Sequence, residues 1–99
     1  MELVERIKGF SIYRSSDGYI VQNEGMEDFA HTHLEGLPQA RKVVKLSMAK
    51  KVPLDLPQYL LISLKRVNDD DLYIEKITQV LANKKKKFYF NSNKGVRRK

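Results

Sequence analysis

The N-terminal part of the fold is decided by the stretch GFSIYRSSDGYIVQNEG, residues 9–25. Apolar and polar side chains alternate over residues 10–13, and a β-rich run returns at residues 19–21. Between them, residues 15–18 read Ser-Ser-Asp-Gly, a composition typical of a tight turn. Gly18 can adopt a positive φ at no steric cost, which a sharp reversal usually requires. The stretch therefore predicts a β-hairpin.

Two neighbouring segments are predicted to enlarge this hairpin into a small antiparallel sheet. The segment LVERI, residues 3–7, extends the first strand in this interpretation, and Gly9 forms a bulge. The segment DFAHTHLEG, residues 28–36, is extended in character and is closed by Gly36. We therefore expect a sheet of two or three strands.

After the sheet, the spacing of apolar residues changes from two to about 3.6. Leu37, Ala40, Val44 and Met48 then share one face of a predicted helix, and Pro38 fits its first turn.

A proline-containing segment, VPLDLP at residues 52–57, interrupts the chain after this helix. We expect Asp55 to cap a second helix and Pro57 to lie in its first turn. That helix, QYLLISLKRV at residues 58–67, is apolar nearly all round and is predicted to be buried.

A third helix is predicted after the sequence NDDD, residues 68–71, which supplies capping side chains and suits the helix dipole. Its inward-facing residues are expected to be Tyr73, Ile74, Ile77, Val80 and Leu81. The predicted fold class is thus α+β, a small N-terminal antiparallel sheet followed by three helices.

The 99 residues are enough for one domain, and 41% apolar content is that of a globular protein. The formal net charge is +7, but residues 84–99 contain eight Lys or Arg and no carboxylate. With +8 in that segment, residues 1–83 together carry −1. We therefore predict a nearly neutral α+β domain at 1–83 and a basic aromatic tail at 84–99, either flexible or docked as a last strand.

The tail combines clustered cations with aromatic side chains, a pattern that favours nucleic-acid binding. Clustered cations release counterions from a polyanion, and aromatic rings stack on unpaired bases. The predicted phosphate contacts are Lys84, Lys85, Lys86, Lys87, Lys94, Arg97, Arg98 and Lys99, and the predicted stacking residues are Phe88, Tyr89 and Phe90. Alternatively, the three aromatic residues pack on the domain as a clasp, and the charge serves only solubility.

A second basic cluster lies on the outer side of the first predicted helix and consists of Arg41, Lys42 and Lys45. If it joins the tail in one nucleic-acid surface, the two clusters should share a face of the molecule. The order of hairpin, third strand and basic helix over residues 10–51 resembles the AP2 domain and recombinase arm-binding domains. The resemblance lies in element order alone, and in this interpretation the basic helix lies against phosphate. Alternatively, the basic residues form the solvated face of an amphipathic helix.

His31 and His33 are spaced to lie on the same face of a strand. They are weak candidates for a metal site, to which Asp28 or Glu35 could add a carboxylate. Zinc usually takes three or four protein ligands, so solvent-facing histidines with local hydrogen bonds are the alternative.

The sequence contains no cysteine, Gly-rich phosphate loop, nucleophile elbow or His-Glu-x-x-His motif, so we expect no enzyme and no cofactor. No signal peptide or membrane span is expected, and a cytoplasmic location is the default. Two functions remain open. One is an accessory protein that binds DNA or RNA electrostatically through its tail. The other is a protein-interaction module or homo-oligomeric structural protein.

Overall fold

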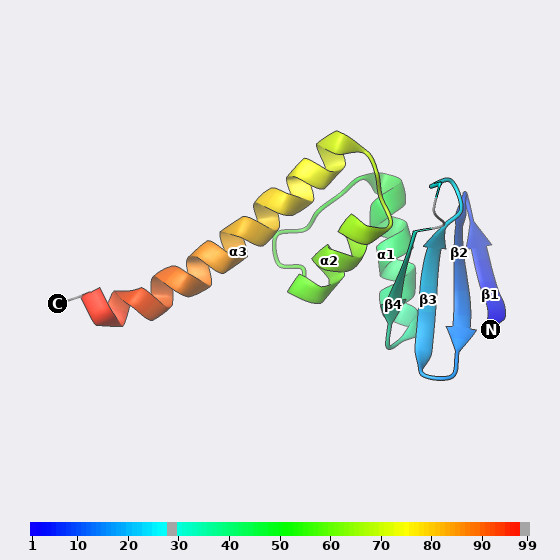
Figure 1. The fold of residues 1–99 in the computed structure, drawn as a ribbon, viewed down its shortest axis with the longest axis horizontal. Coiled ribbons are helices and arrows are strands. Elements are labelled where there is room, and N and C mark those ends of the chain that lie inside the picture. Colours follow the sequence, from blue (N-terminus) through cyan, green and yellow to red (C-terminus); the bar gives the residue numbers. More distant parts are fainter. Residues whose placement is uncertain (28–29, 98–99) are drawn as a thin grey trace.

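The computed structural model describes the backbone of residues 1–27 and 30–97, and the side chains of residues 1–27 and 30–84. A four-stranded antiparallel sheet is followed by three helices (Figure 1). The elements are β1 (Glu2–Ile7), β2 (Phe10–Ser15), β3 (Gly18–Asn23), β4 (His31–Leu34), α1 (Leu37–Ala49), α2 (Gln58–Arg66) and α3 (Asp71–Arg97). The predicted α+β class and the order of strands before helices are confirmed.

The sheet has four strands, so the expectation of two or three was wrong. Residues 2–7 form a separate strand, because Lys8 and Gly9 make a two-residue turn between β1 and β2. Both have positive φ, 43° and 89°, as a type I′ hairpin turn requires. Gly9 is therefore a turn residue, and the register shift in this hairpin lies between Leu3 and Glu5 instead.

The hairpin predicted from residues 9–25 is confirmed as β2 and β3, which pair from Phe10–Asn23 to Ser15–Gly18. Gly18 has a φ of +147°, and a Cβ atom there would lie 2.5 Å from the carbonyl oxygen of Leu34. Only glycine allows β4 to approach this closely. The third predicted strand begins at His31 rather than at residue 28.

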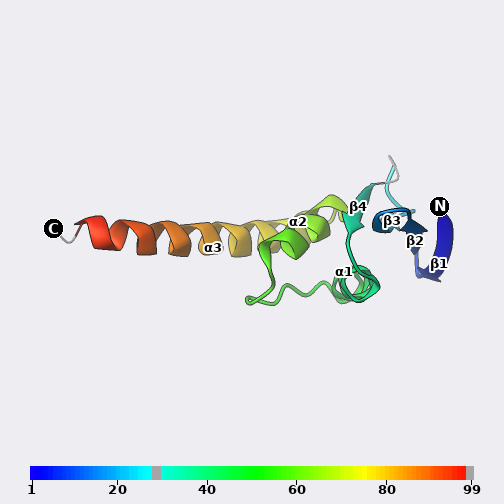
Figure 2. The ribbon, with the colours of Figure 1, turned by 90° about the horizontal axis from the view of Figure 1, so that it is seen from below.

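The elements form two layers. The strands are arranged in the order β1-β2-β3-β4, and α1 lies behind this sheet (Figure 1). Seen from below, α2 lies beyond β4 in nearly the same layer as the sheet, whereas α1 forms the second layer (Figure 2). The described helices thus cover one face of the sheet and its β4 edge, and leave the other face open.

The core lies between the sheet, α1, α2 and the first turns of α3. Ile12 and Val21 are paired on neighbouring strands and are fully buried. The helices contribute Ala40, Val43, Val44, Leu60, Leu61, Leu64, Tyr73 and Ile77 to the same cluster. The expected inward face of α1 is rotated slightly, because Ser47 is buried whereas Met48 is 40% exposed.

The start of α2 differs from the prediction. Pro57 is the N-cap residue, and no side chain caps the helix, so the expected cap at Asp55 was wrong. Nor is α2 buried all round. Because it lies at the margin of the first layer, one side faces solvent and exposes Tyr59 and Ile62.

The start of α3 is as predicted. Asp70 Oδ1 accepts hydrogen bonds from the backbone N–H groups of Leu72, at 3.0 Å, and Tyr73, at 3.2 Å. This is the geometry of an N-cap carboxylate. The predicted inward-facing residues of α3 are buried or half-buried, as expected.

Within the described part of the chain, none of the helices is sufficiently long and apolar to cross a membrane. The predictions for the tail concern mainly residues 85–99, whose side chains lie outside the described residues.

Candidate nucleic-acid interface

The basic residues of α1 lie on its solvent side, as predicted, and all three are exposed. The charge of Arg41 is paired with a carboxylate, because its Nε donates to Glu5 Oε1 of β1 at 2.9 Å. This ion pair draws Arg41 toward the β1 side of the molecule. Lys84 belongs to α3, which leaves the molecule on the opposite side (Figure 1). The structure therefore does not bring the α1 cluster and the root of the tail together.

The arginines of the sheet also contact carboxylates. Arg6 Nη2 lies 3.3 Å from Glu24 Oε2, and Arg14 Nη2 lies 3.5 Å from Glu2 Oε1. Much of the positive charge on the described sheet is thus balanced by the acidic residues of the N-terminal third.

One of these pairs is part of a small polar cluster on the open face of the sheet. The Ser11 hydroxyl donates to Glu24 Oε2, and Arg6 Nε donates to Ser11 Oγ at 3.4 Å. The hydrogen bond from Ser11 and the charge of Arg6 lower the pKa of the Glu24 carboxyl below its ordinary value, against the opposing effect of desolvation. Glu24 therefore stays ionised and holds Arg6 over β2.

His31 and His33 both point to the solvent-facing side of β4, as the two-residue spacing predicted. Their ring centroids are 5.2 Å apart in an edge-to-face arrangement. Among residues 1–27 and 30–84, no third histidine or carboxylate joins them to form a metal-binding group. Asp28, one of the two carboxylates named for this site, lies outside the described residues. The two histidines belong to the open face of the sheet.

That open face carries two cross-strand rows. Register pairing aligns Leu3, Tyr13, Ile20 and His33 in one row, and Arg6, Ser11, Gln22 and His31 in the next. Paired residues in an antiparallel sheet point to the same side, so each row crosses all four strands. The face thus presents aromatic, apolar and basic groups together.

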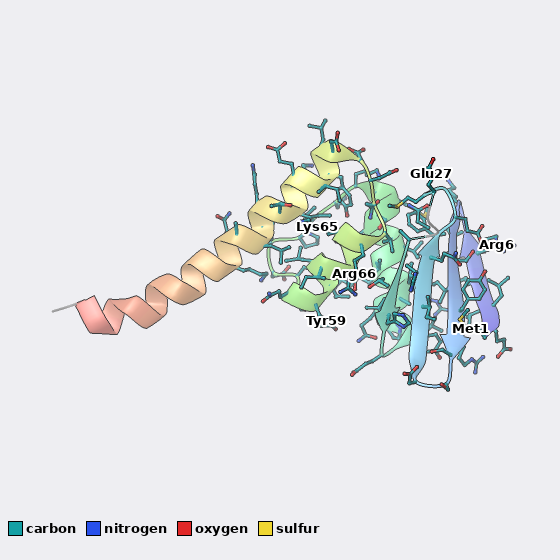
Figure 3. All side chains as sticks on the ribbon, in the orientation of Figure 1. Met1, Arg6, Glu27, Tyr59, Lys65 and Arg66 are labelled. Carbon is teal, nitrogen blue, oxygen red and sulfur yellow. The ribbon has the colours of Figure 1, made fainter. Side chains whose placement is uncertain are left out.

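The solvent side of α2 continues this face beyond β4. Thr32 Oγ1 of β4 donates to Ser63 Oγ at 2.9 Å, and this buried contact holds the two elements side by side. Asn23 Nδ2 donates to the carbonyl oxygen of Val67 at 2.7 Å, near the other end of α2. The exposed residues of α2 include Tyr59, Ile62, Lys65 and Arg66. Figure 3 labels Tyr59, Lys65 and Arg66 on α2, and Arg6 at the far edge of the sheet.

A pocket of about 360 Å³ lies where the end of β4 and the starts of α1 and α2 meet. Its lining residues are His33, Leu34, Glu35, Gln39 and Tyr59. The sequence analysis missed the contribution of α2 to this site. The signal was present, because Tyr59, Ile62 and Arg66 are spaced by three and four residues and so share one face of a helix.

No protein-family model matches this chain, and no curated protein or solved structure matches it either. The resemblance to the AP2 domain and to recombinase arm-binding domains therefore rests on element order alone.

Proposed function

We propose that this protein is a non-catalytic accessory protein that binds nucleic acid through its basic C-terminal segment, residues 84–99. The observation that carries the proposal is the separation of charge along the chain. The segment holds +8, whereas residues 1–83 carry −1. Nearly all of the net attraction for a polyanion therefore comes from 16 consecutive residues.

The ion pairs of the folded part support this assignment. Three arginines of the first 41 residues are bound to carboxylates, so they contribute little free charge to a phosphate backbone. The predicted second contact through α1 loses Arg41 in this way. Residues Lys84 to Lys87 remain the densest cationic cluster in the sequence.

The test is fluorescence anisotropy of labelled single-stranded and duplex DNA and RNA, between about 50 and 200 mM salt. Substituting all four residues from Lys84 to Lys87 by Gln in the full chain should weaken binding to every ligand. For single strands, the slope of log K against log salt should become shallower by about 3, because each phosphate contact contributes about 0.7.

A matched control neutralises four exposed lysines elsewhere, Lys42, Lys45, Lys51 and Lys76. It makes the same change in net charge, so a clearly smaller effect shows that the position of the charge matters. Equal effects of the two variants would contradict the assignment to residues 84–99. Binding no tighter than that of a scrambled peptide of the same composition would contradict nucleic-acid binding altogether.

A second candidate function is a protein-interaction module, in which the basic segment only keeps the protein soluble. The observation that favours it is the exposure of large apolar side chains. Leu54 and Leu72 are 77% and 76% exposed, and each lines a surface pocket. Association of this chain with itself would appear as a concentration-dependent mass in analytical ultracentrifugation, and Leu72→Lys should reduce it.

A further inference from the structure

We propose that the 360 Å³ pocket at the junction of β4, α1 and α2 is a stacking site for unpaired bases, so that the preferred ligand is single-stranded nucleic acid. The pocket and the exposed residues of α2 and β4 beside it are called the groove below. This inference rests on the proposed function and names a contact site that residues 84–99 do not supply. The exposed histidines of β4 lie on the open face of the sheet, which no described helix covers (Figures 1 and 2).

The two walls of the groove run alongside each other in opposite directions. Tyr59 meets the end of β4 at the shared pocket, and Ser63 is hydrogen-bonded to Thr32. Val67 is hydrogen-bonded to Asn23, which itself pairs with Ala30 just before β4. The two elements therefore lie antiparallel to each other along α2.

Each wall carries a stripe of exposed side chains. On α2 the stripe is Tyr59, Ile62 and Arg66, which lie on one helix face. On β4 it is His33 and His31, which point to the same side of the strand. Planar rings from both walls thus border the groove, and planar rings of this kind stack on any base.

The two ends of the groove carry different side chains, which suit bases at one end and phosphates at the other. At one end, the 360 Å³ pocket combines the rings of Tyr59 and His33 with Glu35 and Gln39. A carboxylate and an amide accept hydrogen bonds from the amino groups of bases, and an amide also donates to ring nitrogens and carbonyls. Glu35 therefore suits a base edge, although it would repel a phosphate.

At the other end of α2, Lys65 and Arg66 supply positive charge. Neither forms a salt bridge with any of the described side chains. Arg66 is seven positions after Tyr59 in the helix, about 10 Å along the axis. A single strand lying along the groove would place a base at Tyr59 and phosphates beside Lys65 and Arg66.

Duplex is a poorer fit for the same groove, because the bases of a duplex are stacked on each other and present only their edges. The rings of Tyr59 and His33 both line the pocket, which favours a base that has been freed from a stack. Charge alone does not distinguish single-stranded from duplex nucleic acid. A preference for single strands would therefore arise from the rings that border the groove.

The test is Tyr59→Ala in the full chain, measured by anisotropy with single-stranded and duplex ligands of equal length. Tyr59 is 52% exposed, so its truncation leaves the core intact. We expect single-strand affinity to fall by about 5-fold to 100-fold with an unchanged salt slope, because stacking releases no counterions. Duplex affinity should stay within about 2-fold of the unsubstituted chain.

Two further variants complete the design. Arg66→Gln should make the single-strand salt slope shallower by about 0.7, as the loss of one phosphate contact does. The matched control is Leu72→Ala, which truncates a large exposed side chain on α3, away from the groove, and should change neither quantity.

A photo-crosslink locates the contact directly. After irradiation of a strand that contains 4-thiouracil, tryptic peptides 15–41 and 52–65 should carry the adduct, because they contain His33 and Tyr59. Adducts confined to peptides beyond residue 83 would overturn the groove assignment.

The outcomes separate this inference from the proposed function. If Tyr59→Ala leaves all affinities unchanged while the full chain still binds with a steep salt dependence, the groove is not the site and the basic segment alone binds. A groove that serves a protein partner would give this same result. If the full chain binds no ligand better than the scrambled peptide does, both proposals are wrong.

Discussion

At the scale of single residues, Tyr73 shows how one side chain ties separate parts of the fold together. Its hydroxyl lies 2.7 Å from the carbonyl oxygen of Lys51 and 3.1 Å from that of Leu46. The single hydroxyl proton serves one of these carbonyls at a time. The ring is buried in the core, and the ammonium group of Lys50 lies 5.2 Å from its centroid. The first turn of α3 is thereby fixed to the end of α1.

Replacing this residue by phenylalanine tests the value of the hydroxyl. We expect Tyr73→Phe to lower the free energy of unfolding by about 1–2 kcal/mol, because the one hydroxyl proton that the carbonyl groups of Leu46 and Lys51 share is lost. The control is Tyr59→Phe, where the hydroxyl is at the surface and the loss should be below about 0.5 kcal/mol. Urea denaturation of both variants measures the difference, and equal midpoints would show that the hydroxyl contributes nothing.

The same side chain gives a pH dependence with a defined sign. Burial raises the pKa of Tyr73 from 10.0 to about 12. Between these values the unfolded chain loses the proton while the folded chain keeps it, so stability falls as pH rises from about 10 to about 12. Below pH 10 this contribution is fully present. The alkaline loss of stability should therefore be smaller in Tyr73→Phe than in the unsubstituted chain.

At the scale of elements, the hairpins are fixed by different kinds of turn. The β1–β2 turn needs positive φ at Lys8 and Gly9, and nothing lies within 4 Å of a Cβ placed at Gly9. The β2–β3 turn places Gly18 against the backbone of β4. Gly9 is thus required only for its positive φ. Gly18 is required for its positive φ and also because a side chain there would clash with β4.

These two glycines form a matched pair of variants. Gly9→Ala should cost about 1 kcal/mol of backbone strain, because a positive φ is unfavourable for a residue with a Cβ atom. Gly18→Ala should cost more than this, since the added methyl group also meets the carbonyl oxygen of Leu34 at 2.5 Å. Thermal or urea unfolding measures both, and an equal cost would mean that β4 moves away freely.

Element pairing also explains why α2 is not a buried helix. Its sequence is apolar nearly all round, yet Tyr59 and Ile62 remain exposed, because the described elements that pack against α2 cover only part of its surface. These neighbours are α1, α3 and β4. On this exposed side, Tyr59 lines the 360 Å³ pocket.

At the scale of the whole molecule, the proposed binding of nucleic acid would use different charges from those that are paired within the fold. The four ion pairs of the described residues lie at the surface, where such pairs contribute little to stability. The charge available for a polyanion is concentrated in residues 84–99. Salt should therefore act strongly on binding and weakly on folding.

Raising the salt concentration from about 0.1 to 1 M shortens the Debye length from about 10 to about 3 Å. We expect the free energy of unfolding, measured with urea at both concentrations, to change by about 1 kcal/mol or less. Nucleic-acid affinity should fall by orders of magnitude over a smaller range of salt. A large salt effect on folding would show that the ion pairs matter more than their exposure indicates.

Local patterns in the sequence determined most of the elements correctly. The β2–β3 hairpin follows from alternation and a Ser-Ser-Asp-Gly turn, and the start of α3 follows from an aspartate cap, because both depend on neighbouring residues. The α+β class follows from the order of these patterns. The separate charge of residues 84–99 was equally evident.

Features that depend on which surfaces meet were decided only by the tertiary structure. Lys8 has no strong turn preference, so the separation of β1 from β2 was not evident locally. The position of α2 beside β4 depends on contacts between Thr32 and Ser63, 31 residues apart. The same packing leaves Tyr59 exposed and places it at the pocket that His33 also lines. The burial of a side chain depends on the elements that pack against it, and the polarity of the side chain does not determine it.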